Sequence, residues 1–133
     1  MKTVVLDTDL VSFLFKGDTR GDWYKPYLEG SILVISFMTI AELDRWTLER
    51  NWGDTRKEKM EQHLKKFVFV PYDRQLCLKW AEACYSARRN GKPISTSDAW
   101  VAATALLFDL PLLTHNKNDY LGVDGLTLIS ETL

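Results

Sequence analysis

A short apolar run that ends in an aspartate constrains the fold of this chain more than any other feature. Residues 3–6 are mostly β-branched and have no polar face, which is typical of a strand buried on both sides inside a parallel sheet. Asp7 follows at the carboxyl end of that strand, where open α/β sheets bind their ligands. A lone carboxylate at this position is either a helix cap or a ligand, so other acids along the chain must distinguish the two.

Strand-like and helical patterns alternate along all 133 residues. This alternation is typical of a three-layer α/β/α fold with a central, mainly parallel sheet. A chain of this length suits one core, so we expect a single domain over residues 1–133. Thr8 or Asp9 is the expected cap of the first helix, and a polar loop is expected at 16–21. The expected strands are 3–6, 32–35, 67–70, 112–114 and 126–129, and the expected helices are 10–15, 22–29, 38–52, 54–66, 74–90 and 97–109.

Composition and charge exclude several classes of protein. Apolar residues make up 46% of the chain and charged residues 26%, as in ordinary soluble globular proteins. The formal net charge of −1 gives no global attraction to nucleic acid or membranes, so RNA binding would need a local basic patch. No apolar run reaches transmembrane length and no signal peptide is recognisable, so we expect a cytoplasmic protein without membrane contact. Cys77 and Cys84 are seven residues apart in one expected helix, too far for a disulfide.

Polar side chains occur where expected strands end and expected helices begin. Asp7 ends the first strand, and Glu42 lies in the first turns of the helix after the second strand. Asp98 lies in the first turn of a helix that is apolar almost all round, and Asn116 and Asp119 lie in the loop after the fourth strand. Strand carboxyl ends and the amino ends of the following helices share one edge of such a sheet. We therefore expect these side chains to meet at one rim.

A cluster of acids at one rim needs a neutralising partner. Two carboxylates roughly 4 Å apart repel by about 4 kcal/mol at an effective dielectric near 20. Asp98 heads an apolar helix face, which a role as a helix-dipole partner alone does not explain. No lysine or arginine neighbours Asp7 or Asp98 in the sequence, so a divalent cation is the economical partner. All-oxygen ligands favour Mg²⁺ or Mn²⁺ over zinc, with Asp7 and Asp98 as the expected direct metal ligands.

Four segments, in this order and spacing, resemble the PIN-domain nucleases, and among them the VapC toxins of bacterial and archaeal toxin–antitoxin pairs. The segments are VLDTDLVS (5–12), TIAEL (39–43), GKPISTSDAWVAA (91–103) and LTHNKNDY (113–120), and the resemblance covers essentially the whole chain. It implies a metal-dependent ribonuclease with acids at Asp7, Glu42, Asp98 and the last loop, and Mg²⁺ or Mn²⁺ as cofactor. It also implies RNA substrates, often tRNA or ribosomal RNA, a homodimer, and a cognate antitoxin that blocks the site.

Roles for single residues follow from this scheme. The last position of the family pattern is commonly acidic, and here both Asn116 and Asp119 remain candidates for completing the site. Glu42 is expected to orient the attacking water or assist its deprotonation. Arg89 and Lys92 precede the Asp98 helix and would reach phosphate groups. The candidate RNA contacts are Thr114, His115, Lys92 and Arg89.

Other enzyme classes and a non-enzyme fit less well. Asp7-Thr8-Asp9 also matches the DxDx(T/V) signature of haloacid-dehalogenase-like phosphatases, whose first aspartate is a nucleophile. That class needs a later lysine, a paired acid and usually a longer chain. A receiver domain would have an aspartate ending the third strand, where Pro71 follows Val70, and no G-x-G-x-x-G follows the first strand for dinucleotide binding. The non-enzyme alternative is a PIN-like binding module that has lost catalysis.

Overall fold

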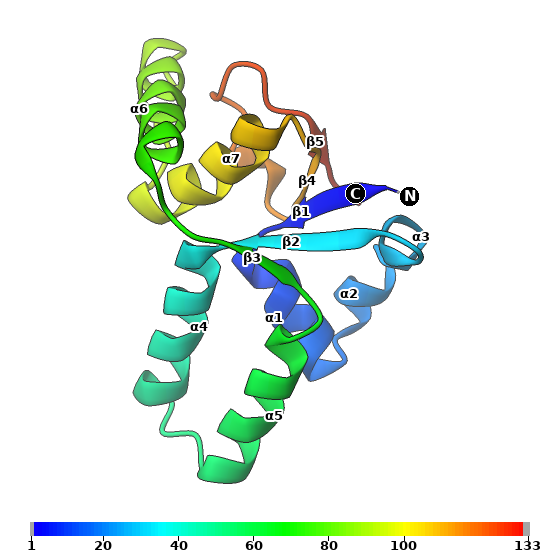
Figure 1. Cartoon of the computed structure of the whole chain (residues 1–133). Helices are drawn as coiled ribbons and strands as arrows, with labels where there is room; N and C mark the ends of the chain where they lie inside the picture. Colours follow the sequence, from blue (N-terminus) through cyan, green and yellow to red (C-terminus); the bar gives the residue numbers. More distant parts are fainter. Residues whose placement is uncertain (1, 132–133) are drawn as a thin grey trace.

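The computed structural model describes residues 2–131 and contains one five-stranded sheet in the order β3-β2-β1-β4-β5. Every neighbouring pair of strands is parallel, which confirms the predicted α/β class (Figure 1). The strands are β1 Thr3–Leu6, β2 Ile32–Ser36, β3 Val68–Val70, β4 Leu112–Leu113 and β5 Leu128–Ile129.

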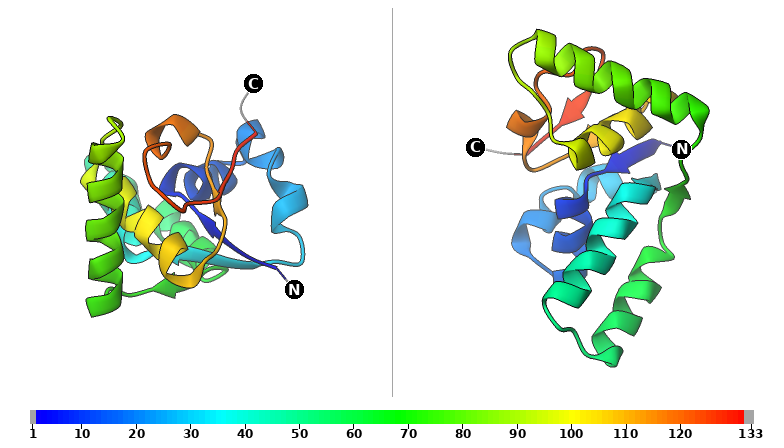
Figure 2. Two further views of the ribbon diagram at one scale, coloured as in Figure 1. Left: turned by 90° about the horizontal axis from the view of Figure 1, so that it is seen from above. Right: turned by 90° about the vertical axis from the view of Figure 1, so that its left-hand side faces the viewer.

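Seven helices and one 3-10 turn connect these strands in the described part of the chain. They are α1 Thr8–Lys16, α2 Thr19–Asp22, α3 Lys25–Leu28, α4 Phe37–Glu49, α5 Asp54–Leu64, α6 Arg74–Arg89, α7 Thr96–Phe108 and η1 Lys117–Asp119. The α4 and α5 helices lie side by side and extend away from the sheet (Figures 1 and 2). None of the helices within residues 2–131 has the length and apolar character that a membrane crossing requires.

Two local predictions were wrong between β1 and β2. The expected loop at 16–21 contains the start of α2, because the Asp18 side chain caps that helix by accepting a hydrogen bond from the Arg20 backbone N–H at 2.9 Å. The single helix expected at 22–29 is replaced by the end of α2 and the separate α3. Pro26 lies in the first turn of α3, where its missing N–H costs nothing, whereas it would interrupt a helix running through from residue 22.

The sheet separates two apolar cores, and β1 contributes to both. Val4 and Leu6 belong to the core shared with α1, α4 and α5, whereas Val5 belongs to the core shared with α6 and α7. This alternation follows from the period of two in a strand. Figure 1 shows α6 and α7 on one side of the sheet and α1, α4 and α5 on the other, as the three-layer prediction requires.

The chain reverses its direction of travel across the sheet between β1 and β4. It builds β1, β2 and β3 toward one edge, then returns past β1 to build β4 and β5 toward the other. The crevice at the carboxyl ends of strands flanking such a switch point is where α/β sheets bind ligands. Leu6 and Leu113 are partners in neighbouring strands, so the residues that follow them, Asp7 and Thr114, emerge side by side at this crevice.

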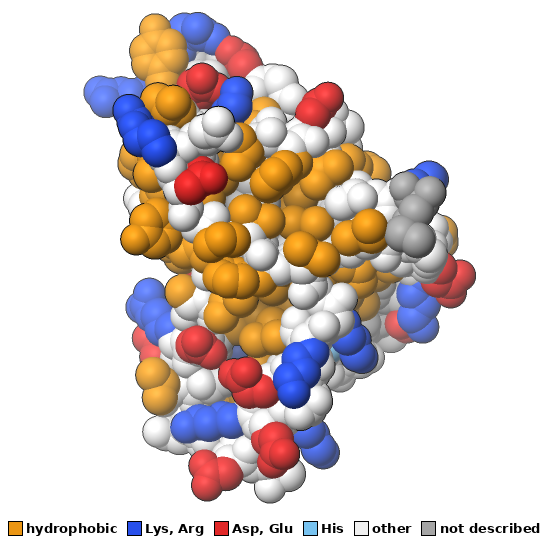
Figure 3. All heavy atoms as spheres, viewed as in Figure 1, with side chains coloured by type: hydrophobic (Ala, Val, Ile, Leu, Met, Phe, Trp, Pro, Cys, Tyr) orange, Lys and Arg blue, Asp and Glu red, His pale blue; other side chains and the backbone are white. Residues whose placement is uncertain are grey.

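The edge strand β3 leaves apolar side chains uncovered. Val68 and Phe69 are 51% and 49% exposed, and Ile32 on the neighbouring β2 is 39% exposed. Figure 3 shows apolar side chains gathered in a band across the middle of the face that carries β2, β3 and α7. An exposed apolar area of this kind is typical of an interaction surface.

Candidate active site

A cleft of about 190 Å³ opens at the carboxyl ends of the strands and brings all five predicted acid-site residues together. The side chains around it come from the starts of α1 and α7, from α4 and from the loop and 3-10 turn after β4. The lining residues of the described chain include no lysine or arginine. They are Asp7, Thr8, Asp9, Glu42, Trp46, Ser95, Ser97, Asp98, Asn116, Asp119 and Tyr120.

Asp7 is the most deeply buried of these acids, at 3% exposed. Its Oδ1 accepts a hydrogen bond from the Leu10 backbone N–H at 2.9 Å, and its Oδ2 accepts one from the Thr114 hydroxyl. Burial raises the pKa of Asp7 to about 7, against the lowering effect of both hydrogen bonds, and the neighbouring carboxylate of Asp9 raises it further. Because its side chain accepts the hydrogen bond from the Leu10 N–H, Asp7 is itself the N-cap of α1. The prediction of Thr8 or Asp9 as that cap was wrong.

Glu42 projects from the second turn of α4 into the same cleft and is half-buried. Its Oε1 accepts a hydrogen bond from the Thr8 hydroxyl at 2.8 Å. Burial raises the pKa of Glu42, and the carboxylates of Asp98 and Asp9 raise it further. Burial therefore raises the pKa of both Asp7 and Glu42, two acids of the same cleft.

Asp98 is half-buried in the first turn of α7, where its backbone N–H donates to Ser95 Oγ at 3.2 Å. Burial raises the pKa of Asp98, and the Asp119 carboxylate raises it further. Tyr120, which lines the cleft and is 2% exposed, donates its phenolic O–H to Asp98 Oδ1 at 3.3 Å. Burial and the nearby Asp7 and Asp98 carboxylates hold the pKa of Tyr120 far above its usual range, so it remains a hydrogen-bond donor.

The two candidates for the last position occupy different environments. Asn116 donates from Nδ2 to Asp9 Oδ2 at 2.6 Å, and its backbone N–H donates to Thr114 Oγ1 at 3.0 Å. Asp119 is exposed, and its carboxylate raises the pKa of Asp98. Both line the cleft, so the choice between them stays open.

Asp9 and Tyr120 are cleft residues that the sequence analysis did not assign to the site. Asp9 lies in the first turn of α1, two residues after Asp7, and was considered only as a helix cap and as part of the phosphatase signature. Its position at a helix start, on the same rim as the other acids, was the available signal. Tyr120 carried no chemical signal, because a buried tyrosine is usually a core residue.

Of the four candidate RNA contacts, only Thr114 lies against the acids. His115 bonds through Nδ1 to the Tyr24 hydroxyl at 2.8 Å and packs among the rings of Phe13, Trp23 and Tyr24. These contacts hold the His115 ring against α1 and the segment of Trp23 and Tyr24, and His115 is not among the residues that line the cleft. Arg89 pairs with Asp124, and Lys92 is exposed; neither lines the cleft.

The carboxylate and amide oxygens of the cleft are ligands of the kind that hard divalent cations take. Within residues 2–131, no group of three or more His, Cys, Asp or Glu side chains is arranged to enclose a metal ion on its own. Mg²⁺ usually takes only one or two protein carboxylates and keeps several waters, so this arrangement is compatible with it. Raised pKa values at Asp7, Glu42 and Asp98 mean that burial outweighs the hydrogen bonds these acids accept. A divalent cation would supply the missing positive charge.

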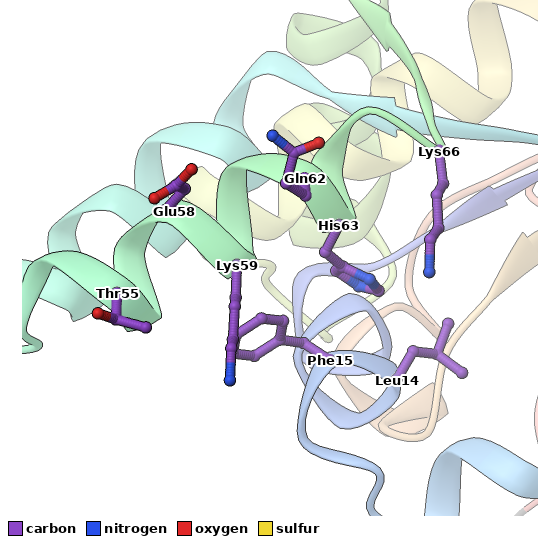
Figure 4. A pocket seen from close by; sticks show the side chains of 8 residues that line it. All are labelled: Leu14, Phe15, Thr55, Glu58, Lys59, Gln62, His63 and Lys66. Carbon is purple, nitrogen blue, oxygen red and sulfur yellow. The ribbon is translucent and has the colours of Figure 1, made fainter.

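A second, wider groove lies between α1 and α5 and has a volume of about 520 Å³. Figure 4 shows Phe15 from α1 beside the stem of Lys59 from α5, with His63 directed toward α1. His63 bonds through Nε2 to the Val11 carbonyl oxygen at 3.2 Å, and burial lowers its pKa. The groove thus combines an apolar floor with the amino groups of Lys59 and Lys66 and with one carboxylate, that of Glu58.

The parallel sheet and the acidic cleft at its switch point define an α/β protein with a carboxylate-rich site. The family model of the PIN domain matches residues 4–125. The chain therefore belongs to the PIN-domain family. It is also similar to Ribonuclease VapC1 of Haemophilus influenzae strain R2866, with 25% identity over 118 residues that cover 87% of this chain and 88% of that protein.

Solved structures share the fold over nearly their whole length. VapBC2 from Rickettsia felis, bound to a DNA fragment from its promoter, has a TM-score of 0.84 at 16% identity, covering 98% of this chain and 99% of that chain. VapBC-1 from nontypeable Haemophilus influenzae has a TM-score of 0.80 at 24% identity, covering 96% and 97%. FitAcB from Neisseria gonorrhoeae has a TM-score of 0.75 at 22% identity, covering 96% of each chain.

Proposed function

We propose that this protein is a Mg²⁺- or Mn²⁺-dependent endoribonuclease that acts in the cytoplasm as the toxin of a toxin–antitoxin pair. The observation that carries the proposal is the cleft in which Asp7, Glu42 and Asp98 meet without a lysine or arginine among the described lining residues. The relatives named Ribonuclease VapC1 support the choice of RNA as substrate. A haloacid-dehalogenase-like phosphatase is disfavoured because none of the cleft-lining residues between positions 2 and 131 is a lysine.

Each acid has a distinct role in this proposal. Asp7 and Asp98 would hold the metal ion, which supplies a Lewis acid and lowers the pKa of water when it is bound. Glu42 orients the attacking water and accepts its proton at a carboxylate oxygen. Tyr120 and Thr114 keep the Asp98 and Asp7 carboxylates in place by donating hydrogen bonds to them. Asn116 orders Asp9 at the edge of the cleft.

A cognate antitoxin is the second part of the proposal. A toxin–antitoxin complex from Klebsiella pneumoniae shares this fold with a TM-score of 0.73 at 19% identity. The groove between α1 and α5 would bind an amphipathic segment of such a partner. Leu14 and Phe15 would receive its apolar side chains, and Lys59 and Lys66 would pair with its acids (Figure 4).

A second copy of the chain is proposed to cover the apolar sheet edge. Val68 and Phe69 are about half exposed on β3, and burial of such a surface is the usual driving force for a symmetric dimer. Sedimentation of the wild type and of Phe69→Glu tests this: the wild type should sediment as a dimer and the variant as a monomer. A wild type that is monomeric at micromolar concentration contradicts the dimer.

Cleavage of RNA tests the activity. Purified protein should cut a mixture of cellular RNAs, tRNA and ribosomal RNA included, only when Mg²⁺ or Mn²⁺ is present, and EDTA should stop the reaction. Sequencing the new RNA ends then identifies the substrate. Undiminished cleavage in EDTA would exclude the metal mechanism. A protein that binds RNA, binds Mn²⁺ and cuts nothing would favour the binding-module alternative.

A further inference from the structure

The hydroxyls of two buried threonines, Thr8 and Thr39, form a hydrogen-bonded chain that ends at the Glu42 carboxylate. Thr8 Oγ1 lies 2.8 Å from Glu42 Oε1 and donates to it, and Thr39 Oγ1 lies 3.0 Å from Thr8 Oγ1. Thr39 is fully buried and Thr8 is 6% exposed, so bulk water does not compete for these hydroxyls. The three residues come from two helices, since Thr8 begins α1 and the other two lie one turn apart on α4.

The hydrogens of this chain of hydroxyls can point in only one direction. A hydroxyl has one hydrogen to donate, and that of Thr8 goes to the Glu42 carboxylate. Thr8 Oγ1 must therefore act as acceptor toward Thr39, and Thr39 must be the donor. The sequence of donations runs from Thr39 to Thr8 to Glu42 Oε1, and each member polarises the next.

We propose that Thr8 and Thr39 are positioning residues that fix the orientation of the Glu42 carboxylate. With Oε1 engaged by Thr8, the other carboxylate oxygen is the one available to the cleft. Thr8 also follows Asp7 directly in the chain, so the same turn of α1 sets the two acids relative to each other. The proposal rests on the proposed function for its kinetic consequences, but the contact itself can be tested without RNA.

The substitution Thr8→Val removes the hydroxyl and keeps the β-branched shape. Residues that hold an active-site or metal-binding side chain in place typically contribute 10- to 100-fold to activity or metal affinity. We therefore expect Thr8→Val to lower kcat by about tenfold or more with KM for RNA unchanged. Thr8→Ser restores the donor and should recover most of kcat. Thr39→Val removes only the distal donor, so its loss of kcat should be smaller than that of Thr8→Val.

Thr104→Val is the matched control. Thr104 is also a fully buried threonine, but its hydroxyl donates to the Trp100 carbonyl oxygen within α7 at 3.0 Å, and it does not line the cleft. The Thr104→Val variant should have a lower melting temperature than the wild type. Its kcat, and the rise in melting temperature that Mn²⁺ produces, should be unchanged. Thr8→Val should reduce that rise. The positioning role is wrong if Thr8→Val and Thr104→Val have the same effects on both quantities, or if Thr8→Ser is as impaired as Thr8→Val.

A double-mutant cycle in EDTA separates this proposal from the nuclease assignment. Thr8→Val, Glu42→Ala and the double variant are melted without metal or RNA, so the result does not depend on activity. Coupled residues give non-additive changes, and we expect the double variant to lose less stability than the sum of the single variants. Additive changes would overturn the contact even if the protein cuts RNA. Coupling in a protein that cuts no RNA would keep the contact and reject the nuclease. If Thr8→Val does not fold, Thr8→Ala replaces it in the cycle with Glu42→Ala, with the same criterion.

Discussion

The hydroxyl of Thr114 donates a hydrogen bond to Oδ2 of Asp7, although the two residues are 107 positions apart in the chain. The contact joins the ends of β1 and β4, which flank the switch point of the sheet. Because Oδ1 accepts a second hydrogen bond, from the Leu10 N–H, the Asp7 carboxylate is held in one orientation. A single carboxylate thus caps a helix and faces the candidate metal site.

Asp7→Asn should abolish cleavage while stabilising the metal-free protein at pH 8. The asparagine oxygen can still cap α1, and the substitution removes a buried charge whose pKa lies near 7. We expect the melting temperature in EDTA to rise by several degrees, and the Mn²⁺-induced rise to disappear. Scanning calorimetry with EDTA and with Mn²⁺ measures both. A variant that melts lower in EDTA and still responds to Mn²⁺ would mean that Asp7 is only a cap.

The stability of the metal-free protein should fall as pH rises from about 4 to above 7. Burial raises the folded-state pKa of Asp7 from 3.8 to about 7, so protonation favours the folded state. This contribution is fully present below the unfolded pKa and is lost as pH rises through the folded pKa. Mn²⁺ competes with the proton, so its effect on melting should grow over the same interval. Melting curves of the wild type and Asp7→Asn between pH 5 and 8 test this, since the variant should lack most of the slope.

Asp98→Asn should remove nearly all nuclease activity without destabilising the metal-free protein. It keeps the α7 helix start and the hydrogen bond from Tyr120, but removes a carboxylate whose pKa is raised by burial. Asp124→Asn is the matched control, because Asp124 is an exposed acid that pairs with Arg89 away from the cleft. Cleavage rates and Mn²⁺-dependent melting should change for the first variant only. A structural Asp98 would instead lose a little stability and keep both properties.

Reversing the charge of the α1–α5 groove should separate partner binding from catalysis. Lys59→Glu combined with Lys66→Glu would repel an acidic partner segment, yet neither residue lines the acidic cleft. We expect the affinity for the proposed cognate antitoxin to fall at least tenfold while RNA cleavage remains. Calorimetric titration measures the affinity, and Lys65→Glu, an exposed α5 neighbour outside the groove, is the control. Unchanged affinity would exclude this groove as the binding site of the partner.

The sequence predicted those parts of the site that depend on local periodicity. The apolar run at residues 3–6 predicted that Asp7 lies at the end of a strand. The apolar face of the helix at 97–109 predicted that Asp98 lies beside the core and does not point into water. The side chain of His115 was not predictable in this way, because its neighbours in space, Phe13 and Tyr24, come from distant segments. The same limit applies to Asp9, whose bond to Asn116 also spans 107 positions.

Helix boundaries between β1 and β2 were missed for a different reason. The α2 helix has only four residues, too few for an apolar period to appear in the sequence. Its start depends on one side-chain cap at Asp18, and its packing depends on Gly21, where an added Cβ would lie 3.1 Å from the Leu14 side chain. Such close packing is decided by tertiary contacts, which no short window of sequence contains.

The return of the chain from β3 to β4 fixes when the active site can first exist during synthesis. Asp7 and Glu42 leave the ribosome early, but Thr114 and Tyr120, which orient Asp7 and Asp98, belong to its last quarter. Because chains emerge from their N-terminus at a limited rate, every nascent chain passes through a long period in which it holds acids but no ordered cleft. Under the proposed function, the nascent chain would leave the messenger and ribosome that make it uncut until β4 is paired with β1.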